Sequence, residues 1–450
     1  MNRDYLTESR PLPALTVFVI PILLGNLFQQ FYNLVDSAIV GRYVGENALA
    51  AVGACLAFTN VFIFIANGGG IGSSVIVGRY FGSKDYSKMK TAIFTAFIAF
   101  AVFSLILGLF GLVFGRFIMI LLRTPDDVLD LATIYLNIYF IGLPFLFLYN
   151  VTSSMFNALG KSKFPLLFLI ISSLMNIGLD ILFVKYLQWG VAGAAWATLI
   201  AQGTSFLLSF SVFLLELSKL GIKKTPYFSK YELFRMAKIA FPSIIQQSTI
   251  SIGLMLVQSV VNSFGPQTLA GYSVGLRIEA IGSVAMIAPG TALSTYTAQN
   301  YGAKKFHRIK EGFVAANIIV SFCALLFFTI LRFLKINIID LFLAENRSKT
   351  AFDTAVAYLD YMSLVISLLG FKLNIDGVLR GIGRMKVFTV ASLVNITIRV
   401  SFSNIFAPII GVQAVWISNP IGWAVSFVLC YIAYKLWYSI HFRELEMTSA

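Results

Sequence analysis

The sequence predicts an all-α integral membrane protein with twelve transmembrane helices, arranged as two parallel six-helix repeats around a central cleft. Of its 450 residues, 58% are hydrophobic and only 12% are charged, whereas a soluble domain is about 45 to 50% apolar and about 25% charged. Apolar runs long enough to cross a bilayer return throughout the chain. Short motifs of the first half also recur in the second half at a nearly constant spacing.

The apolar runs fit helices rather than barrel strands. A transmembrane helix needs about 20 apolar residues, because the hydrocarbon core is about 30 Å thick and a helix rises about 1.5 Å per residue. The runs are continuous and do not alternate like the strands of a membrane barrel. Twelve segments meet this description: 14–36, 50–74, 91–114, 132–155, 165–185, 190–215, 238–261, 270–296, 313–333, 355–378, 387–407 and 412–438.

Lysine and arginine are concentrated on one side of the predicted membrane. Of the 34 basic residues, 23 fall on the side shared by both termini and 8 on the opposite side. Basic loops stay in the cytoplasm during insertion, so we expect both termini to be cytoplasmic. We also expect the protein to lie in the plasma membrane and to be a monomer. The net charge of +14 is thus mainly a topology signal. We expect the protein to contact membrane lipids and not to bind nucleic acid.

The second half of the chain repeats the first. Glycines, aromatic residues and basic loop residues recur 220 or 223 positions later, which indicates an internal duplication. The matched pairs are Gly45 with Gly265, Tyr80-Phe81-Gly82 with Asn300-Tyr301-Gly302, Tyr135-Leu136 with Tyr358-Leu359, Gly160-Lys161 with Gly383-Arg384, and Trp196 with Trp416.

Six predicted spans per copy mean that both copies enter the membrane in the same orientation. We predict an N-terminal six-helix lobe at 1–216, a basic cytoplasmic linker at 217–236 and a C-terminal six-helix lobe at 237–450. Parallel repeats of this kind hold a substrate at their interface and rock against each other. The chain is 15% aromatic, so such a cleft is expected to be lined by Phe and Met.

Enzymatic function has little support in the sequence. The three cysteines stand apart in apolar runs and the two histidines in polar segments, a distribution that forms no zinc or redox motif. The stretch Gly160-Lys161-Ser162 resembles the end of a phosphate-binding loop, but Met155 stands where that loop needs glycine. We therefore expect no enzyme activity and no cofactor.

Four polar residues of the first lobe form a candidate ion site. A charged residue at the centre of a membrane helix costs about 2.5 to 3.5 kcal/mol, so such residues mark functional sites. Asp180 lies in the fifth span with Asn176 one turn before it, Asp36 lies near the outer end of the first span, and Thr198 lies at a similar depth in the sixth. Their oxygen atoms suit a small cation such as Na⁺, or shared protons. An interfacial helix end for Asp36, and a structural hydrogen bond between Asn176 and Asp180, are the alternatives.

The second lobe changes this pattern. Asn176 corresponds to Asn395 and Thr198 to Ser418, whereas Asp180 corresponds to Arg399. A cation in place of an anion predicts that the two lobes are functionally unequal, with ion coupling in the first.

Other polar residues of the second lobe are candidates for the substrate cleft. Glu279 and Arg277 lie two positions apart in the eighth span and so on different faces of the helix. Glu279 is expected either to attract a cationic substrate or to pair with Arg399 or with another helix. Gln247 supplies a polar group in the seventh span. Asp376, flanked by Lys372 and Arg380 at spacings of four, is predicted to belong to a ladder of ion pairs along one helix.

These motifs together resemble those of the multidrug and toxic compound extrusion (MATE) family. The resemblance covers nearly the whole chain and rests on the two six-helix copies and on three stretches: Val35-Asp36-Ser37-Ala38-Ile39-Val40-Gly41-Arg42, Leu49-Ala50-Ala51-Val52-Gly53 and Leu379-Arg380-Gly381-Ile382-Gly383.

The resemblance implies an antiporter that exports amphipathic, mostly cationic drugs in exchange for H⁺ or Na⁺, and that takes part in antibiotic resistance and xenobiotic transport. It also implies that Asp36, Asn176, Asp180 and Thr198 are the coupling residues. The C-lobe cation site of some members is not expected, because the large polar groups of the seventh span are the glutamines Gln246, Gln247 and Gln258. A flippase for a lipid-linked saccharide precursor, of related architecture, is the alternative function.

Overall fold

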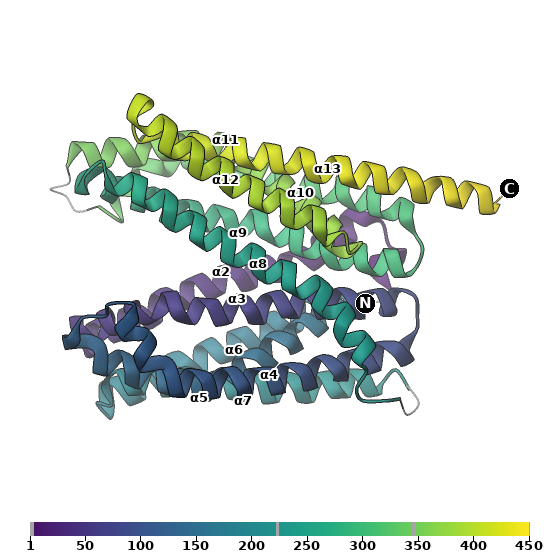
Figure 1. The fold of residues 1–450 in the computed structure, drawn as a ribbon, viewed down its shortest axis with the longest axis horizontal. Helices are drawn as coiled ribbons and strands as arrows, with labels where there is room; N and C mark the ends of the chain where they lie inside the picture. Colours follow the sequence, from purple (N-terminus) through teal and green to yellow (C-terminus); the bar gives the residue numbers. More distant parts are fainter. Residues whose placement is uncertain (1–3, 222–224, 344–347, 450) are drawn as a thin grey trace. The chain divides into compact units, whose positions relative to one another are not determined.

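The computed structural model describes residues 4–221, 225–343 and 348–449, and this part of the chain is helical and contains no strand. Figure 1 shows long helices joined by short connections. The helices are α1 (Tyr5–Glu8), α2 (Pro11–Tyr43), α3 (Glu46–Gly82), α4 (Tyr86–Leu121), α5 (Asp126–Ala158), α6 (Lys163–Asp180) continued by the π-helix η1 (Ile181–Tyr186), α7 (Gly190–Ser218), α8 (Lys230–Asn262), α9 (Pro266–Gly302), α10 (Phe306–Asp340), α11 (Lys349–Gly381), α12 (Met385–Ile410) and α13 (Gln413–Ser449).

The twelve predicted spans each correspond to a long helix, from α2 to α13 with α6 and η1 as one. Among the described residues, eleven of these helices are long and apolar enough to cross a membrane. The helix outside this group is α8. The prediction of an all-α membrane protein is confirmed.

The chain divides into two compact units. One contains residues 24–244, and the other contains residues 1–23 together with 245–450. The lobes predicted from the sequence are the two copies of the duplicated chain, residues 1–216 and 237–450, with residues 217–236 as the linker between them. The compact units group residues by packing, so the first residues of α2 belong with the C-terminal repeat and the first residues of α8 with the N-terminal repeat. We call residues 24–244 the first unit and the remainder the second unit.

The duplication is visible in the backbone itself. Lys84 and Lys304 both adopt left-handed conformations, with φ of 59° and 57°, directly after equivalent helices. Gly160 and Gly383 do the same with φ of 75° and 71°, a conformation that glycine adopts without steric penalty. Equivalent positions therefore end equivalent helices in both repeats.

Polar contacts hold the chain start against the second unit. The side-chain amide of Asn300 donates to the carbonyl of Leu6 (3.1 Å), and the ammonium of Lys305 donates to the carbonyl of Thr7 (3.0 Å). The guanidinium of Arg308 donates to the carbonyl of Ser9 (2.5 Å). Three long side chains from the α9–α10 region thus satisfy backbone acceptors of α1 and its C-cap, which explains why these residues group with the second unit.

The start of α8 is held in the first unit by a similar set of contacts. The hydroxyl of Tyr80 donates to Glu232 (2.6 Å), and Arg235 contacts the same hydroxyl. The backbone N–H of Ser229 donates to the hydroxyl of Thr95 (3.0 Å). The predicted basic linker is therefore anchored where it leads into α8.

Glycines allow the closest helix approach in the second unit, between α9 and α11. A Cβ atom added at Gly377 would lie 2.3 Å from the carbonyl oxygen of Gly290, and one added at Gly290 would lie 2.6 Å from that of Leu373. Small residues let membrane helices pack backbone to backbone. In the first unit, a Cβ atom at Gly70 would lie 2.4 Å from Ser154 Oγ, so the matching helices α3 and α5 approach in the same way.

We expect Gly377→Ala to destabilise the protein, because the new methyl group overlaps a backbone oxygen that cannot rotate away. Overpacking of this kind costs about 1 to 3 kcal/mol. Thermal unfolding of the purified protein in detergent should show a lower Tm than the wild type. The matched control is Gly53→Ala, since a Cβ atom there has nothing within 4 Å. Equal Tm values for the two variants would show that the α9–α11 approach is looser than described.

Candidate functional site

The first unit brings the four candidate ion-site residues together from three helices. Asp36 lies on α2, Thr198 lies on α7, and Asn176 and Asp180 lie on α6. Asp180 is the last α-helical residue before the π-helix η1. Single π-helical turns within α-helices are rare and occur often at functional sites. The equivalent helix of the second unit, α12, continues as an α-helix through Arg399.

Asn176 links Asp180 to Thr198. We assign its amide by its neighbours, because only one orientation gives both sides of the amide a partner. In that orientation its nitrogen donates to Asp180 Oδ2 (2.9 Å), and its oxygen accepts from Thr198 Oγ1 (3.3 Å) and from the Thr198 backbone N–H (3.2 Å). Asn176 is 1% exposed and Asp180 is 0% exposed. The amide therefore holds the carboxyl of Asp180 in a fixed place.

The carboxyl groups of Asp36 and Asp180 lie within hydrogen-bonding reach of each other. Two ionised carboxylates repel strongly in an apolar setting, so the pair is stable only with a proton or a cation between its members. The Oδ1 atom of each carboxyl is buried and has no hydrogen-bond partner among the described residues. The site therefore offers unsatisfied oxygen acceptors, which is the chemistry that binds H⁺ or Na⁺.

Within the described residues, no group of three or more His, Cys, Asp or Glu side chains is placed to hold a metal ion. The candidate site combines two carboxyls with a neutral amide and a hydroxyl. These are hard oxygen ligands, which bind hard cations and differ from the thiolate and imidazole ligands that soft metal ions prefer.

Two tyrosines complete the surroundings of the carboxyls, and the sequence analysis did not single them out for the site. Tyr32 lies near both carboxyls, and its hydroxyl is within hydrogen-bonding reach of Thr198. Tyr135, on α5, also lies near both carboxyls. A signal was present for each: Tyr32 precedes Asp36 by one helical turn, and Tyr135 is matched by Tyr358 in the repeat.

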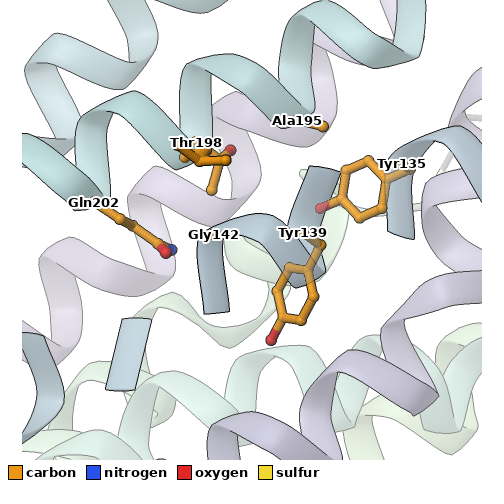
Figure 2. A pocket seen from close by; sticks show the side chains of 7 residues that line it. Tyr135, Tyr139, Gly142, Ala195, Thr198 and Gln202 are labelled. Atoms are coloured by element: carbon orange, nitrogen blue, oxygen red, sulfur yellow. The ribbon is translucent and has the colours of Figure 1, made fainter. Parts of the chain in front are cut away.

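A small pocket opens beside Thr198. Its volume is about 10 Å³, roughly the space that one water molecule needs. Figure 2 shows the hydroxyl of Tyr135 on the side of the pocket that faces Thr198, whereas the hydroxyl of Tyr139 points away. Tyr139 donates to the backbone carbonyl of Thr59 (3.3 Å). The pocket gives a water or a small ion a place next to the hydroxyl of Thr198.

The second unit holds a different polar cluster at the equivalent place. The hydroxyl of Tyr358 donates to the carboxylate of Glu279, and the guanidinium of Arg399 is close enough to interact with the same carboxylate. Tyr272 packs edge-on against Tyr358 with ring centroids 5.3 Å apart. The carboxylate of Glu279 therefore lies among Tyr358, Tyr272 and Arg399 within the second unit.

The remaining candidates lie apart from this cluster. Arg277 is exposed and Gln247 is partly buried. Lys372 and Asp376 form an ion pair (2.5 Å) between side chains that are 4% and 1% exposed. Lys372 and Asp376, four residues apart, therefore form an ion pair inside the second unit. Arg380 lies close enough to interact with Asp376.

Comparison with known proteins agrees with the repeat. The MatE family model matches residues 21–182 and again residues 242–405. The chain is 30% identical over 433 residues to a probable multidrug resistance protein, YpnP, of Bacillus subtilis strain 168, covering 95% of this chain and 96% of that protein. It is 22% identical over 437 residues to the multidrug export protein MepA of Staphylococcus haemolyticus, covering 96% and 95%.

Solved structures share the fold. An outward-facing multidrug resistance MATE family transporter of the MOP superfamily superposes with a TM-score of 0.89 at 22% identity, over 98% of this chain and 99% of that one. A MOP superfamily transporter from Pyrococcus furiosus, described as having a binding pocket of reverse polarity, gives a TM-score of 0.90 at 21% identity, over the same shares. The family model, the curated relatives and the fold agree: the chain belongs to the MATE family of multidrug efflux transporters.

Proposed function

We propose that the protein is a cation-coupled antiporter that exports amphipathic, mostly cationic compounds from the cell by alternating access, driven by H⁺ or Na⁺. The observation that carries the proposal is the contact between the carboxyls of Asp36 and Asp180, with Asn176 and Thr198 bonded beside them. We place the chain in the plasma membrane with both termini in the cytoplasm, on the distribution of lysine and arginine.

Coupling follows from the electrostatics of the carboxyl pair. When a proton or sodium ion binds between Asp36 and Asp180, the repulsion between the carboxyls disappears and α2 is drawn toward α6. When the ion leaves, the same repulsion favours an arrangement in which the two helices separate. An ion that binds one arrangement more tightly than the other shifts the equilibrium between them, and a drug that prefers the second arrangement drives the reverse shift.

Substrate charge is the second part of the proposal. The multidrug names of the relatives favour small organic compounds over a lipid-linked saccharide. We assign Glu279, Arg277, Arg399 and Gln247 to the substrate region of the second unit. Within this group, Glu279 supplies the negative charge, and Arg399 limits the net attraction by balancing it.

Asp180→Asn tests the ion site directly. The amide keeps the size of the carboxyl and removes its charge, so we expect ion-driven export to be abolished while the protein still folds and inserts. The assay is drug efflux from proteoliposomes with an imposed proton or sodium gradient. Asp130→Asn is the control, because Asp130 has a side chain that is 78% exposed and forms an ion pair with Arg116 away from the ion site. Wild-type export by the Asp180 variant would refute the assignment.

Thr198→Val removes one hydroxyl from the ion site at nearly constant volume. Asn176 then loses a hydrogen bond worth about 0.5 to 1.5 kcal/mol, and Asp180 is held less firmly. We expect the ion concentration for half-maximal export to rise by about two- to tenfold. Ser205→Ala is the control: its buried hydroxyl joins the same two helices by donating to the carbonyl of Phe168 (3.1 Å). An equal shift in both variants would indicate a packing effect and not ion coordination.

The identity of the coupling ion is a separate question with a simple measurement. Drug efflux is compared in vesicles that carry only a proton gradient and in vesicles that carry only a sodium gradient. The carboxyl pair predicts export under at least one of the two. Export that needs neither gradient would contradict coupling altogether.

A further inference from the structure

Two helices of the second unit present polar faces to each other. Ser392, Asn395 and Arg399 recur on α12 at spacings of three and four, which places them on one face of that helix. Asn419, Ser426 and the thiol residue Cys430 recur on α13 at spacings of seven and four, again on one face. α12 and α13 pack along much of their length, and we call these six residues the polar seam.

The two faces meet at Gly422. A Cβ atom at this glycine would lie 2.3 Å from Asn395 Oδ1 and 3.0 Å from Arg399 Cγ. Gly422 lies one turn from Asn419 and one turn from Ser426 on α13. The side chains of α12 therefore lie directly against the polar face of α13.

Five atoms of the polar seam are buried without a hydrogen-bond partner among the described residues. They are Ser392 Oγ, Asn395 Oδ1, Arg399 Nε, Asn419 Oδ1 and Ser426 Oγ. Each of these side chains is more than nine-tenths buried. A buried polar atom left unsatisfied costs about 1 to 3 kcal/mol, so five in one seam would be a large penalty. Buried water molecules typically make about three hydrogen bonds each to such groups, so water bound in the seam would remove this penalty.

The polar seam ends at a charged group on each side. At one end, Arg399 interacts with Glu279, which accepts from Tyr358. At the other end, the thiol of Cys430 donates to Asp376 Oδ1 (3.7 Å). Asp376 is ion-paired with Lys372. The seam therefore runs from one buried charge cluster to another within a single unit.

The first unit provides an internal comparison. At a displacement of 220, Asn419, Ser426 and Cys430 correspond to Leu199, Phe206 and Phe210. Phe206 and Phe210 stack on each other with ring centroids 5.5 Å apart. Apolar side chains thus occupy the equivalent helix face in the first unit. A polar face at this place is accordingly not a general requirement of the fold.

We propose that the polar seam binds a file of water molecules, and that this file lets protons reach the Lys372–Asp376 ion pair inside the second unit. A proton entering at one end is passed along hydrogen-bonded water while another leaves at the far end, so no covalent bond of the protein changes. The ligand is water, and the function is proton access to a charge cluster that is separate from Asp36 and Asp180.

The thiol of Cys430 reports on this file. Cys430 is 0% exposed, and its S–H stretch falls in an infrared window that other protein groups leave clear. With Cys55→Ala and Cys323→Ala, Cys430 is the only thiol, and its exchange from S–H to S–D is followed after transfer into heavy water. The reference protein carries Cys323→Ala and Cys430→Ala and keeps Cys55. Cys55 is also 0% exposed and donates to the carbonyl of Ala132 (3.6 Å) in an apolar cluster.

We expect the S–H of Cys430 to exchange several-fold faster than that of Cys55. Asn419→Leu and Ser426→Val, each made in the Cys430-only protein, should slow it several-fold by displacing water. Ser403→Ala should leave the rate unchanged, because the hydroxyl of Ser403 already donates to Ser418 (3.2 Å). The idea is overturned if Cys430 exchanges as slowly as Cys55, or if the two apolar substitutions leave its rate unaltered. The measurement needs no transport, so its outcome is independent of the ion site in the first unit.

Discussion

The absence of water from the hydrocarbon core of a membrane is the constraint on which the rest of this structure depends. Backbone groups that cannot bond to water must bond within the chain, so the described residues form long helices. Those helices cannot gain stability by excluding water from one another, and so they pack closely through glycines such as Gly290 and Gly377. Inside the membrane, a charged side chain is stable only where another polar group forms a hydrogen bond or an ion pair with it. The same constraint explains the helices, their close approach and the clustering of the buried charges.

Duplication then supplied two copies of one scaffold with different electrostatics. The first unit places two carboxyls within hydrogen-bonding reach of each other. In the second unit Arg399 stands at the position equivalent to Asp180, close enough to interact with the carboxylate of Glu279. A guanidinium remains charged at any physiological pH, so its charge cannot leave as an ion does. The first unit therefore holds two acidic groups close together, whereas the second unit holds a permanent positive charge at the position equivalent to Asp180.

Much of this arrangement can be predicted from the sequence, and the reasons are physical. Span length, the excess of basic residues on one side and the recurrence of motifs determine the helices and the duplication. The spacing of four between Asn176 and Asp180 predicts their contact, and helix depth predicts that Thr198 lies near them. The sequence does not show that the α-helix changes to a π-helix after Asp180, because that change depends on packing against neighbouring helices. It also does not single out Tyr32 and Tyr135, because tyrosine is common near membrane interfaces and its spacing alone does not distinguish a site from a packing contact.

For a related reason, the sequence does not predict that residues 1–23 pack with the C-terminal repeat. This grouping depends on Asn300, Lys305 and Arg308, which donate hydrogen bonds to backbone carbonyls nearly 300 positions earlier in the chain. Every residue has a backbone carbonyl, so the sequence does not indicate which carbonyls these side chains bond. The start of α8 is bonded to the first unit through Tyr80 and Glu232 in a comparable way. Each repeat is thus bonded at its beginning to the body of the other repeat. The helix α2 consequently begins among the residues of the second unit and carries Asp36 in its later part, which belongs to the first unit.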